Sequence, residues 1–349
     1  MQRIQVVNKL IGPGQPVFVI AEAGVNHNGD LQMARALIDV AVEAGADAVK
    51  FQTFSADRLV TTDAPKAEYQ LQTTGDRESQ FEMLRRLELS AEYHRELQSY
   101  CNERGIIFLS TPFDEEAVDL LDELGVPAFK ISSGDLTNSP LLEYVASKGK
   151  PVILSTGMSE LSELIEAVSV LNTAGCENPV LLHCVSNYPA VPSEVNLRAM
   201  QTMRSAFDVP VGFSDHTKGI DVAIAAVALG ACVIEKHFTL DRTLFGPDHR
   251  ASLEPAELRG LVQSIRRVES ALGSGRKVPA PSEIETAKVA RRSLVAARDI
   301  PAGATLERAM VVMRRPGTGL SPAMIDTVLG RRAVRDIAAG TLLDARMFD

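Results

Sequence analysis

Two lysines stand inside short apolar segments of the sequence, where a charged side chain is unexpected. Lys50 lies in AVKFQT and Lys130 in AFKISSG. A buried ammonium group is costly unless an anion lies beside it. These lysines could therefore bind a phosphate or carboxylate group of a ligand. The alternative is an ion pair with a glutamate of the same sheet, Glu22 or Glu235.

Hydroxyl side chains stand at the ends of similar apolar segments. They are Thr111, Ser133, Ser155 and Ser214, and Ser133 and Ser155 belong to SSG and STG sequences that are typical of tight turns. One such hydroxyl is usually a helix cap. Together with two lysines and the N–H groups of the turns, the set predicts a phosphate-binding site.

Two histidines end successive apolar segments, His216 in SDH and His237 in EKH. Neighbouring strand ends bring such side chains together, so the pair predicts a site for a divalent metal ion. Two imidazoles completed by ligand oxygens and water suit Mn²⁺, Zn²⁺ or Co²⁺ better than Mg²⁺. We expect Mn²⁺, with Co²⁺ or Mg²⁺ as alternatives. His183 is predicted to be structural, and His27 and His249 are weaker site candidates.

Two carboxylates, Glu22 and Asp135, complete the set of reactive groups. A metal ion can polarise a carbonyl group, and carboxyl groups can move protons. The whole set suits a reaction in which a phosphorylated carbon nucleophile attacks a metal-polarised carbonyl.

The elements that position these residues are eight apolar segments, each followed by a stretch with helical periodicity. The segments are FVIAEAG from Phe18, ADAVKFQT from Ala46, IIFLST from Ile106, AFKIS from Ala128, PVILST from Pro151, PVLLHCV from Pro179, VPVGFSD from Val209 and CVIEKHF from Cys232. Eight such units predict an α/β fold of the (β/α)₈ TIM-barrel type, in which strand ends converge on one active-site mouth. An open, doubly wound sheet is the competing fold, because periodicity does not report closure.

The chain divides into two predicted domains. Residues 1–275 form the barrel, 276–290 a Gly/Pro/Lys-rich linker, and 291–349 a small β-rich domain with an internal repeat, ARDIPAGATLERAM and VRDIAAGTLLDARMF. Within the barrel, residues 54–88 form an unusually long connection. Such a connection is either a lid over the site or a surface excursion with an extra helix.

Composition limits the partners. A net charge of −9 and an isoelectric point near 5.3 argue against nucleic acid. The four cysteines show no pairing pattern, and no stretch of the sequence resembles a signal peptide or a membrane span. We therefore expect a cytoplasmic protein with a small anionic substrate and no membrane partner.

The ordered motifs AEAGVNHNGDL, VKFQTF, STPFD, KISSGD, ILSTGM, HCVSNYP, GFSDHT, EKHFTLDR and GPDH resemble the sialic acid synthases over essentially the whole chain. The C-terminal part, with RRPGTG, resembles their antifreeze-like (SAF) domain. The resemblance implies that phosphoenolpyruvate condenses with an open-chain N-acetylmannosamine-type sugar and water. The products would be a nine-carbon 2-keto acid, N-acetylneuraminate, and phosphate.

The resemblance also implies roles for individual residues. It places phosphoenolpyruvate on Lys50, Thr111, Lys130, Ser133, Ser155, Ser186 and Ser214, the metal ion on His216 and His237, and the sugar on Gln52, Asp135, Tyr188, Asp248 and Arg315. Glu22 would be an acid/base or water-orienting group. Arg315 would reach the sugar from the SAF domain of the partner subunit in a domain-swapped homodimer.

The sugar side departs from the pattern of N-acetylneuraminate-forming members. The differing positions are Asp135, Ser186, Phe245 and Val289. A synthase of N,N'-diacetyllegionaminate, which uses 2,4-diacetamido-2,4,6-trideoxymannose, is therefore an alternative, and a pseudaminate synthase is a less favoured one. Two other interpretations remain. One is a Schiff-base aldolase with Lys130 as its reactive amine, and the other is a binding module on a degenerate barrel.

Overall fold

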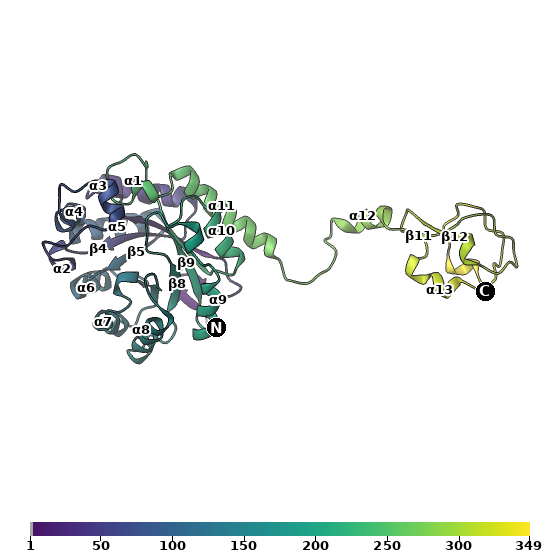
Figure 1. Cartoon of the computed structure of the whole chain (residues 1–349), viewed down its shortest axis with the longest axis horizontal. Coiled ribbons are helices and arrows are strands. Elements are labelled where there is room, and N and C mark those ends of the chain that lie inside the picture. Colours follow the sequence, from purple (N-terminus) through teal and green to yellow (C-terminus); the bar gives the residue numbers. More distant parts are fainter. Residues whose placement is uncertain (1–2) are drawn as a thin grey trace. The chain divides into compact units, whose positions relative to one another are not determined.

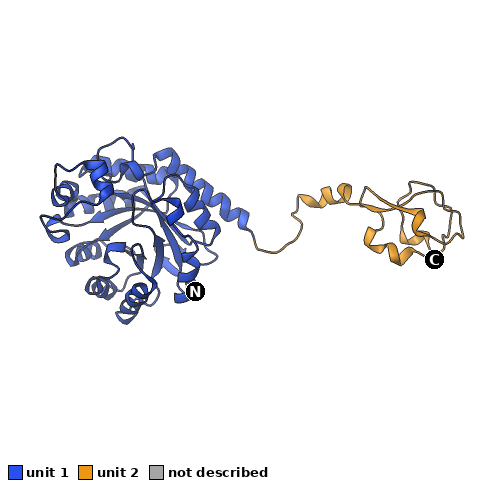
Figure 2. Ribbon diagram, viewed as in Figure 1, with its two compact units in different colours: residues 1–273 blue, residues 274–349 orange. Residues whose placement is uncertain are grey.

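A computed structural model describes residues 3–349 as two compact units, residues 1–273 and 274–349 (Figures 1 and 2). The division falls after Gly273, two residues before the predicted end of the barrel domain at 275. The second unit includes the predicted linker. Part of that linker is helical, because Glu283–Ala290 form α12, which has no buried residue.

The first unit is built on eight parallel strands, one from each predicted segment. They are β3 (Phe18–Gly24), β4 (Ala48–Thr53), β5 (Ile107–Pro112), β6 (Phe129–Ile131), β7 (Val152–Ser155), β8 (Val180–Cys184), β9 (Val211–Asp215) and β10 (Val233–His237). The strands are ordered as they occur in the chain, and the last, β10, pairs with the first, β3. Strands β5 and β6 pack side by side and complete the ring. This closure excludes the open doubly wound sheet.

Side chains alternate between the two faces of each strand, and the inward face changes from apolar to polar along the strand. Phe18 and Ile20 belong to the interior apolar cluster, and Glu22 is the next inward residue of β3. In β10, Val233 is followed in the same way by Glu235 and His237. The apolar layer thus fills the barrel near the strand starts and leaves the polar groups at the strand ends.

Helices surround the strands, as Figure 1 shows. They are α1 (Leu31–Ala44), α5 (Ala91–Arg104), α6 (Glu115–Glu123), α7 (Ser139–Ser147), α8 (Leu161–Thr173), α9 (Ala199–Phe207), α10 (Asp221–Ala228) and α11 (Pro255–Leu272). Helix α1 begins where Asp30 accepts the Met33 N–H and ends at the left-handed Gly45. Within residues 3–349, no helix is long and apolar enough to cross a membrane.

Two parts of the first unit were not predicted in this form. A hairpin of β1 (Ile4–Val6) and β2 (Lys9–Ile11) adds Ile4, Val6 and Ile11 to the interior apolar cluster, and so covers the strand-start end of the barrel. The long connection after β4 contains three short helices, α2 (Ala56–Leu59), α3 (Glu68–Thr74) and α4 (Gln80–Leu87).

The loop after β3 anchors this long connection to the barrel. Its Gly29 has a φ of 78°, and a Cβ atom there would lie 2.7 Å from the carbonyl oxygen of Arg86 in α4, so glycine is required. The Gly29 N–H donates to Nδ1 of His27, whose side chain is fully buried. Burial lowers the pKa of His27 to about 3.

The buried His27 predicts a loss of stability in acid. Its folded-state pKa lies below the ordinary 6.5, so the unfolded chain binds the proton more tightly, and the stabilisation is present above pH 6.5 and falls below it. Between pH 6.5 and pH 5 this group should cost about 2 kcal/mol. Urea unfolding at pH 7 and pH 5, followed by circular dichroism, should show a smaller pH difference for His27→Gln than for the unchanged protein. Equal differences would contradict the assignment.

The second unit has a small apolar core of its own. Strands β11 (Ser293–Ala296) and β12 (Val311–Arg314) pair antiparallel, and α13 spans Ile325–Val328. The two copies of the repeat contact each other through an isolated antiparallel bridge between Ile300 and Ile337. This bridge joins equivalent positions of the two copies, as expected for a pseudo-symmetric domain.

Candidate active site

The strand ends of the barrel surround a cavity of about 420 Å³. Twelve of the fifteen predicted site residues line it: Glu22, Lys50, Gln52, Thr111, Lys130, Ser133, Ser155, Ser186, Tyr188, Ser214, His216 and His237. They come from strands or strand-end loops around the whole barrel. The inward-facing positions of the strands therefore supply one polar chamber.

The two lysines at the base of the cavity are paired with glutamates, as the alternative interpretation expected. The Lys50 ammonium lies 2.9 Å from Glu22 Oε2 and 3.8 Å from Glu235 Oε2, and that of Lys130 lies 3.5 Å from Glu235 Oε1. All four side chains are at most 4% exposed. Ion pairing and anion binding are compatible here, because both lysines also line the cavity.

Burial separates the acid strengths of the two glutamates. It raises the pKa of Glu22 to about 7, against the opposing charge of Lys50. Burial acts in the same direction on Glu235, but Lys130 and Lys50 outweigh it and hold the pKa of Glu235 below its usual value. Near neutral pH, Glu22 can therefore gain or release a proton while Glu235 stays ionised. Burial lowers the pKa of Lys130, against the attraction of Glu235. With Glu22 protonated and both lysines charged, two ammonium groups face one carboxylate, and the net positive charge favours an anion.

Hydroxyl groups lie beside this charged cluster. Thr111 Oγ1 accepts a hydrogen bond from Lys50 at 2.9 Å, and Ser214 Oγ donates to Glu235 at 3.0 Å. The Ser155 hydroxyl is buried and, within the described part of the chain, has no hydrogen-bond partner. A buried hydroxyl in a polar cavity without a partner is suited to bind a ligand.

The loops after β6, β7 and β8 meet at Gly157 of the STG turn. Its N–H donates to Ser133 Oγ at 2.9 Å, and a Cβ atom at this position would lie 2.3 Å from Ser186 Oγ and 2.8 Å from Cys184 Sγ. Only glycine lets these side chains converge. The predicted phosphate-binding site therefore depends on a glycine at this position.

The two strand-end histidines lie together, with ring centroids 5.4 Å apart. Burial lowers the pKa of His216 to about 4 and that of His237 well below its ordinary value, so both are neutral near pH 7. His216 Nδ1 lies 2.7 Å from the Val185 carbonyl oxygen and must donate to it, which leaves the lone pair on Nε2. His237 Nδ1 is buried without a hydrogen-bond partner in residues 3–349.

These properties fit two metal ligands, since a metal-binding imidazole must be neutral and present a lone pair. No group of three or more His, Cys, Asp and Glu side chains in the described residues is arranged to hold a metal ion. A metal ion on His216 and His237 would therefore need ligand oxygens or water for its remaining positions.

Aromatic rings connect the histidines to one wall of the cavity. The Tyr188 ring centroid lies 4.1 Å from that of His216 and 5.0 Å from that of Tyr69. Asp248 Oδ2 lies 3.9 Å from His237 Nδ1, and burial raises the pKa of Asp248 to about 7. Asp248 is thus beside the histidine pair but is not among the residues that line the cavity.

Several predicted site residues lie elsewhere. Asp135 does not line the cavity, because its carboxylate accepts hydrogen bonds from Ser132 and Asn138 within its own loop. Asp215, which stands between Ser214 and His216, was not assigned to the site, and it faces outward from β9 and pairs with Lys236 at 2.7 Å. Arg315 follows β12 in the second unit, where it is exposed. The weaker candidates His27 and His249 are buried and do not line the cavity.

The cavity residues that sequence reasoning did not assign to the site include Glu235, Tyr69 and Gln80. Glu235 was given a role only as an ion-pair partner, although it stands two residues before His237 and therefore faces the same way. Tyr69 and Gln80 lie in the long connection after β4 and line the cavity from there. They carry no strand-end pattern, so the sequence offered no comparable signal for them.

Comparisons with known proteins identify relatives along almost the entire chain. The NeuB family model matches residues 37–277 and the SAF domain model matches residues 291–349. An N,N'-diacetyllegionaminic acid synthase of Legionella pneumophila is 50% identical over 336 residues, 95% of this chain and 94% of the relative. Its counterpart from Campylobacter jejuni is 50% identical over 328 residues, 93% of this chain and 98% of the relative.

Solved structures agree with these relatives. The crystal structure of an N-acetylneuraminic acid (sialic acid) synthetase of Leptospira borgpetersenii in complex with citrate is 40% identical, with a TM-score of 0.72, and covers 82% of this chain and 95% of that chain. The chain therefore belongs to the NeuB family and carries an SAF domain at residues 291–349.

Proposed function

We propose that the protein condenses phosphoenolpyruvate with 2,4-diacetamido-2,4,6-trideoxymannose and water, forming N,N'-diacetyllegionaminate and phosphate. The observation that carries the choice of sugar is the 50% identity, over more than nine-tenths of the chain, to two diacetyllegionaminic acid synthases. The structurally similar sialic acid synthetase is 40% identical. N-acetylneuraminate formation, which the motifs alone favoured, becomes the competing function.

The charged cluster supports the phosphoenolpyruvate half of the proposal. Lys50 and Lys130 would hold the phosphate and carboxylate groups, helped by the unpaired Ser155 hydroxyl and by Ser133 and Ser214. Burial of the two lysines, Ser155 and Ser214 strengthens their interactions with an anion, because little water screens them. The site would thus orient the enol carbon toward the histidine side of the cavity.

The reaction forms one carbon–carbon bond and breaks one carbon–oxygen bond. Carbon three of phosphoenolpyruvate attacks the sugar aldehyde, whose oxygen takes up a proton, and water adds at carbon two as the phosphate leaves. Glu22, with a pKa of about 7, is suited to give or take a proton in these steps. A divalent metal ion bound by His216 and His237, with Mn²⁺ as our first expectation, would polarise the aldehyde.

A panel of sugars tests the proposed substrate. Phosphate release from phosphoenolpyruvate should be at least about 100-fold more efficient, in kcat/KM, with the diacetamido sugar than with N-acetylmannosamine. Equal or better use of N-acetylmannosamine would assign the protein to N-acetylneuraminate formation instead.

We also propose that Arg315 completes the site from the partner subunit of a homodimer. Arg315→Ala should raise the KM for the sugar about tenfold, with the KM for phosphoenolpyruvate unchanged, because an exposed cation is lost from the sugar side only. Co-expression of the Arg315→Ala chain with a His237→Ala chain, which is expected to be inactive, gives a sharper test. In a mixed dimer, the intact barrel belongs to the Arg315→Ala chain, and the intact Arg315 belongs to the His237→Ala chain. The KM for the sugar therefore returns to normal only if Arg315 acts between subunits. A mixed dimer that is active but keeps the raised KM for the sugar would show that Arg315 acts on the barrel of its own subunit.

A further inference from the structure

The connection between β4 and α5 forms one wall of the cavity, although none of its residues belongs to a barrel strand. Ala67, Tyr69 and Gln80 of this connection line the cavity. Tyr69 packs on Tyr188, which in turn packs on His216. The wall therefore stands on the histidine side, where the proposed function places the sugar.

A chain of amide hydrogen bonds fixes the orientation of Gln80. The Ala67 N–H donates to Gln70 Oε1 at 3.0 Å, so that atom must be the oxygen of the Gln70 amide. Gln80 Nε2 donates to the same oxygen at 3.2 Å. This bond uses one of the two Gln80 amide protons, and leaves the other proton and the carbonyl oxygen available to a ligand.

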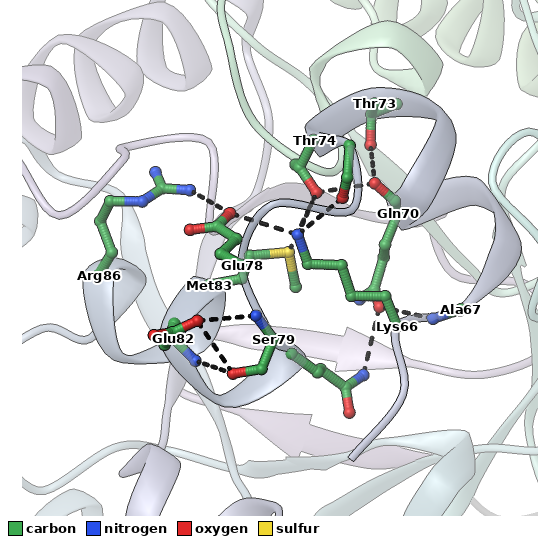
Figure 3. Close-up of polar contacts among 12 residues, drawn as sticks. Lys66, Ala67, Gln70, Thr73, Thr74, Glu78, Ser79, Glu82, Met83 and Arg86 are labelled. Atoms are coloured by element: carbon green, nitrogen blue, oxygen red, sulfur yellow. Dashed lines mark hydrogen bonds and ion pairs between the residues drawn. The ribbon is translucent and has the colours of Figure 1, made fainter. Parts of the chain in front are cut away.

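Lys66 joins the parts of the wall. Its side chain is 2% exposed, and its ammonium group contacts Thr74 Oγ1 at 2.9 Å, the Gly75 carbonyl oxygen at 3.1 Å and Glu78 Oε1 at 3.4 Å (Figure 3). Arg86 pairs with the same Glu78 oxygen at 3.1 Å. Lys66 thus ties the end of α3 to the turn before α4, which sets the position of Tyr69 relative to Gln80.

An apolar base holds the wall against the barrel. Met83 and Leu87 of α4 are fully buried and belong to a cluster with Val25 and Phe54. With the Lys66 contacts above it, this cluster makes residues 61–88 an ordered wall. The connection contains three helices, where the surface-excursion alternative expected one extra helix, and it lines the cavity, as the lid alternative expected.

The half-buried, cavity-lining amide of Gln80 matches the chemistry of an acylamino group. Such a group presents one N–H donor and one carbonyl acceptor, and a carboxamide side chain can bind both. The Tyr69 ring beside it offers an apolar surface for the acyl methyl group. A sugar with a hydroxyl in place of the second acylamino group carries neither the carbonyl nor the methyl group.

We propose that residues 61–88 select the sugar, with Gln80 binding its second acylamino group and Lys66 positioning the wall. This inference rests on the proposed function, because it assigns a binding partner to the substituent that distinguishes the diacetamido sugar from N-acetylmannosamine.

Replacing Gln80 with leucine tests the binding role. The variant should lose about 10- to 100-fold in kcat/KM for the diacetamido sugar, with the KM values for phosphoenolpyruvate and N-acetylmannosamine unchanged. Gln72→Leu is the matched control, because Gln72 is an exposed residue of α3 whose side chain, among the described residues, hydrogen-bonds only to Glu68. The control should keep the selectivity of the unchanged protein.

Replacing Lys66 with methionine tests the positioning role. The variant should raise the KM for the diacetamido sugar and lower the selectivity ratio, while the KM for phosphoenolpyruvate stays constant. A purely structural Lys66 would reduce the fraction of folded protein and leave both KM values and the ratio unchanged, which would overturn the positioning role.

The outcomes separate this inference from the proposed function. If the unchanged protein prefers N-acetylmannosamine, the proposed function is wrong and the inference falls with it. If the unchanged protein prefers the diacetamido sugar and Gln80→Leu retains that preference, only the inference is wrong.

Discussion

Replacement of Lys130 with methionine should lower kcat/KM for phosphoenolpyruvate about a thousandfold, or about 4 kcal/mol. Methionine keeps most of the side-chain volume but removes the cation. The remaining Glu235 carboxylate would then face the cavity with Lys50 as its only ammonium partner among the described residues. An anionic substrate would lose the attraction of the Lys130 ammonium group and would be repelled by the Glu235 carboxylate. Phosphate release measured over a range of phosphoenolpyruvate concentrations reports the change.

Lys236→Met is the matched control. Lys236 is also buried and pairs with a carboxylate on the neighbouring strand, Asp215 at 2.7 Å, but both face away from the cavity. Each variant leaves a buried carboxylate short of a partner, so both should be destabilised by a few kcal/mol. Only Lys130→Met should lose affinity for phosphoenolpyruvate. Equal kinetic losses in the two variants would mean that Lys130 acts through stability alone.

The same lysine allows the Schiff-base interpretation to be tested. A reactive amine would form an adduct with pyruvate that borohydride traps, and its activity would survive removal of metal ions. We expect no trapped adduct on Lys130. Trapping together with chelator-resistant activity would overturn the phosphoenolpyruvate mechanism.

The barrel and most of the site could be predicted because both follow from one regularity. Alternation along a strand places residues two apart on the same face, and parallel strands end at the same side of the sheet. Lys50, Lys130 and His237 stand at inward positions, so their convergence follows from the pattern. The same rule places Glu235 on the inward face of β10 and Asp215 on the outward face of β9.

Loops outside this regularity could not be placed from the sequence. Asp135 follows β6, but its loop turns the carboxylate toward Ser132 and Asn138. Tyr69 and Gln80 reach the cavity through a connection whose path depends on the buried Lys66 and on Met83. Tertiary contacts of this kind join residues without a repeating spacing. The sugar side was therefore less predictable than the phosphate side.

Replacement of His237 with alanine should abolish phosphate release, by about a thousandfold or more, while the protein stays folded. The change removes one of two neutral, buried imidazoles, and a divalent ion cannot stay bound to His216 alone with useful affinity. After chelation and reloading with Mn²⁺, the variant should retain no bound metal, and the unchanged protein should retain about one ion per chain.

The metal assignment can be separated from general damage to the barrel. His183→Ala removes an imidazole from the neighbouring part of the sheet, but His183 bonds to the Val195 carbonyl oxygen and does not line the cavity. It should keep both metal binding and turnover. Full activity of the metal-stripped unchanged protein, or normal Mn²⁺ retention by His237→Ala, would show that the two histidines serve the sugar or the fold instead. Mn²⁺ retention and phosphate release are measured on the same preparations. A variant that loses the metal ion but keeps its turnover would therefore be recognised, and it would contradict a role of the metal ion in the reaction.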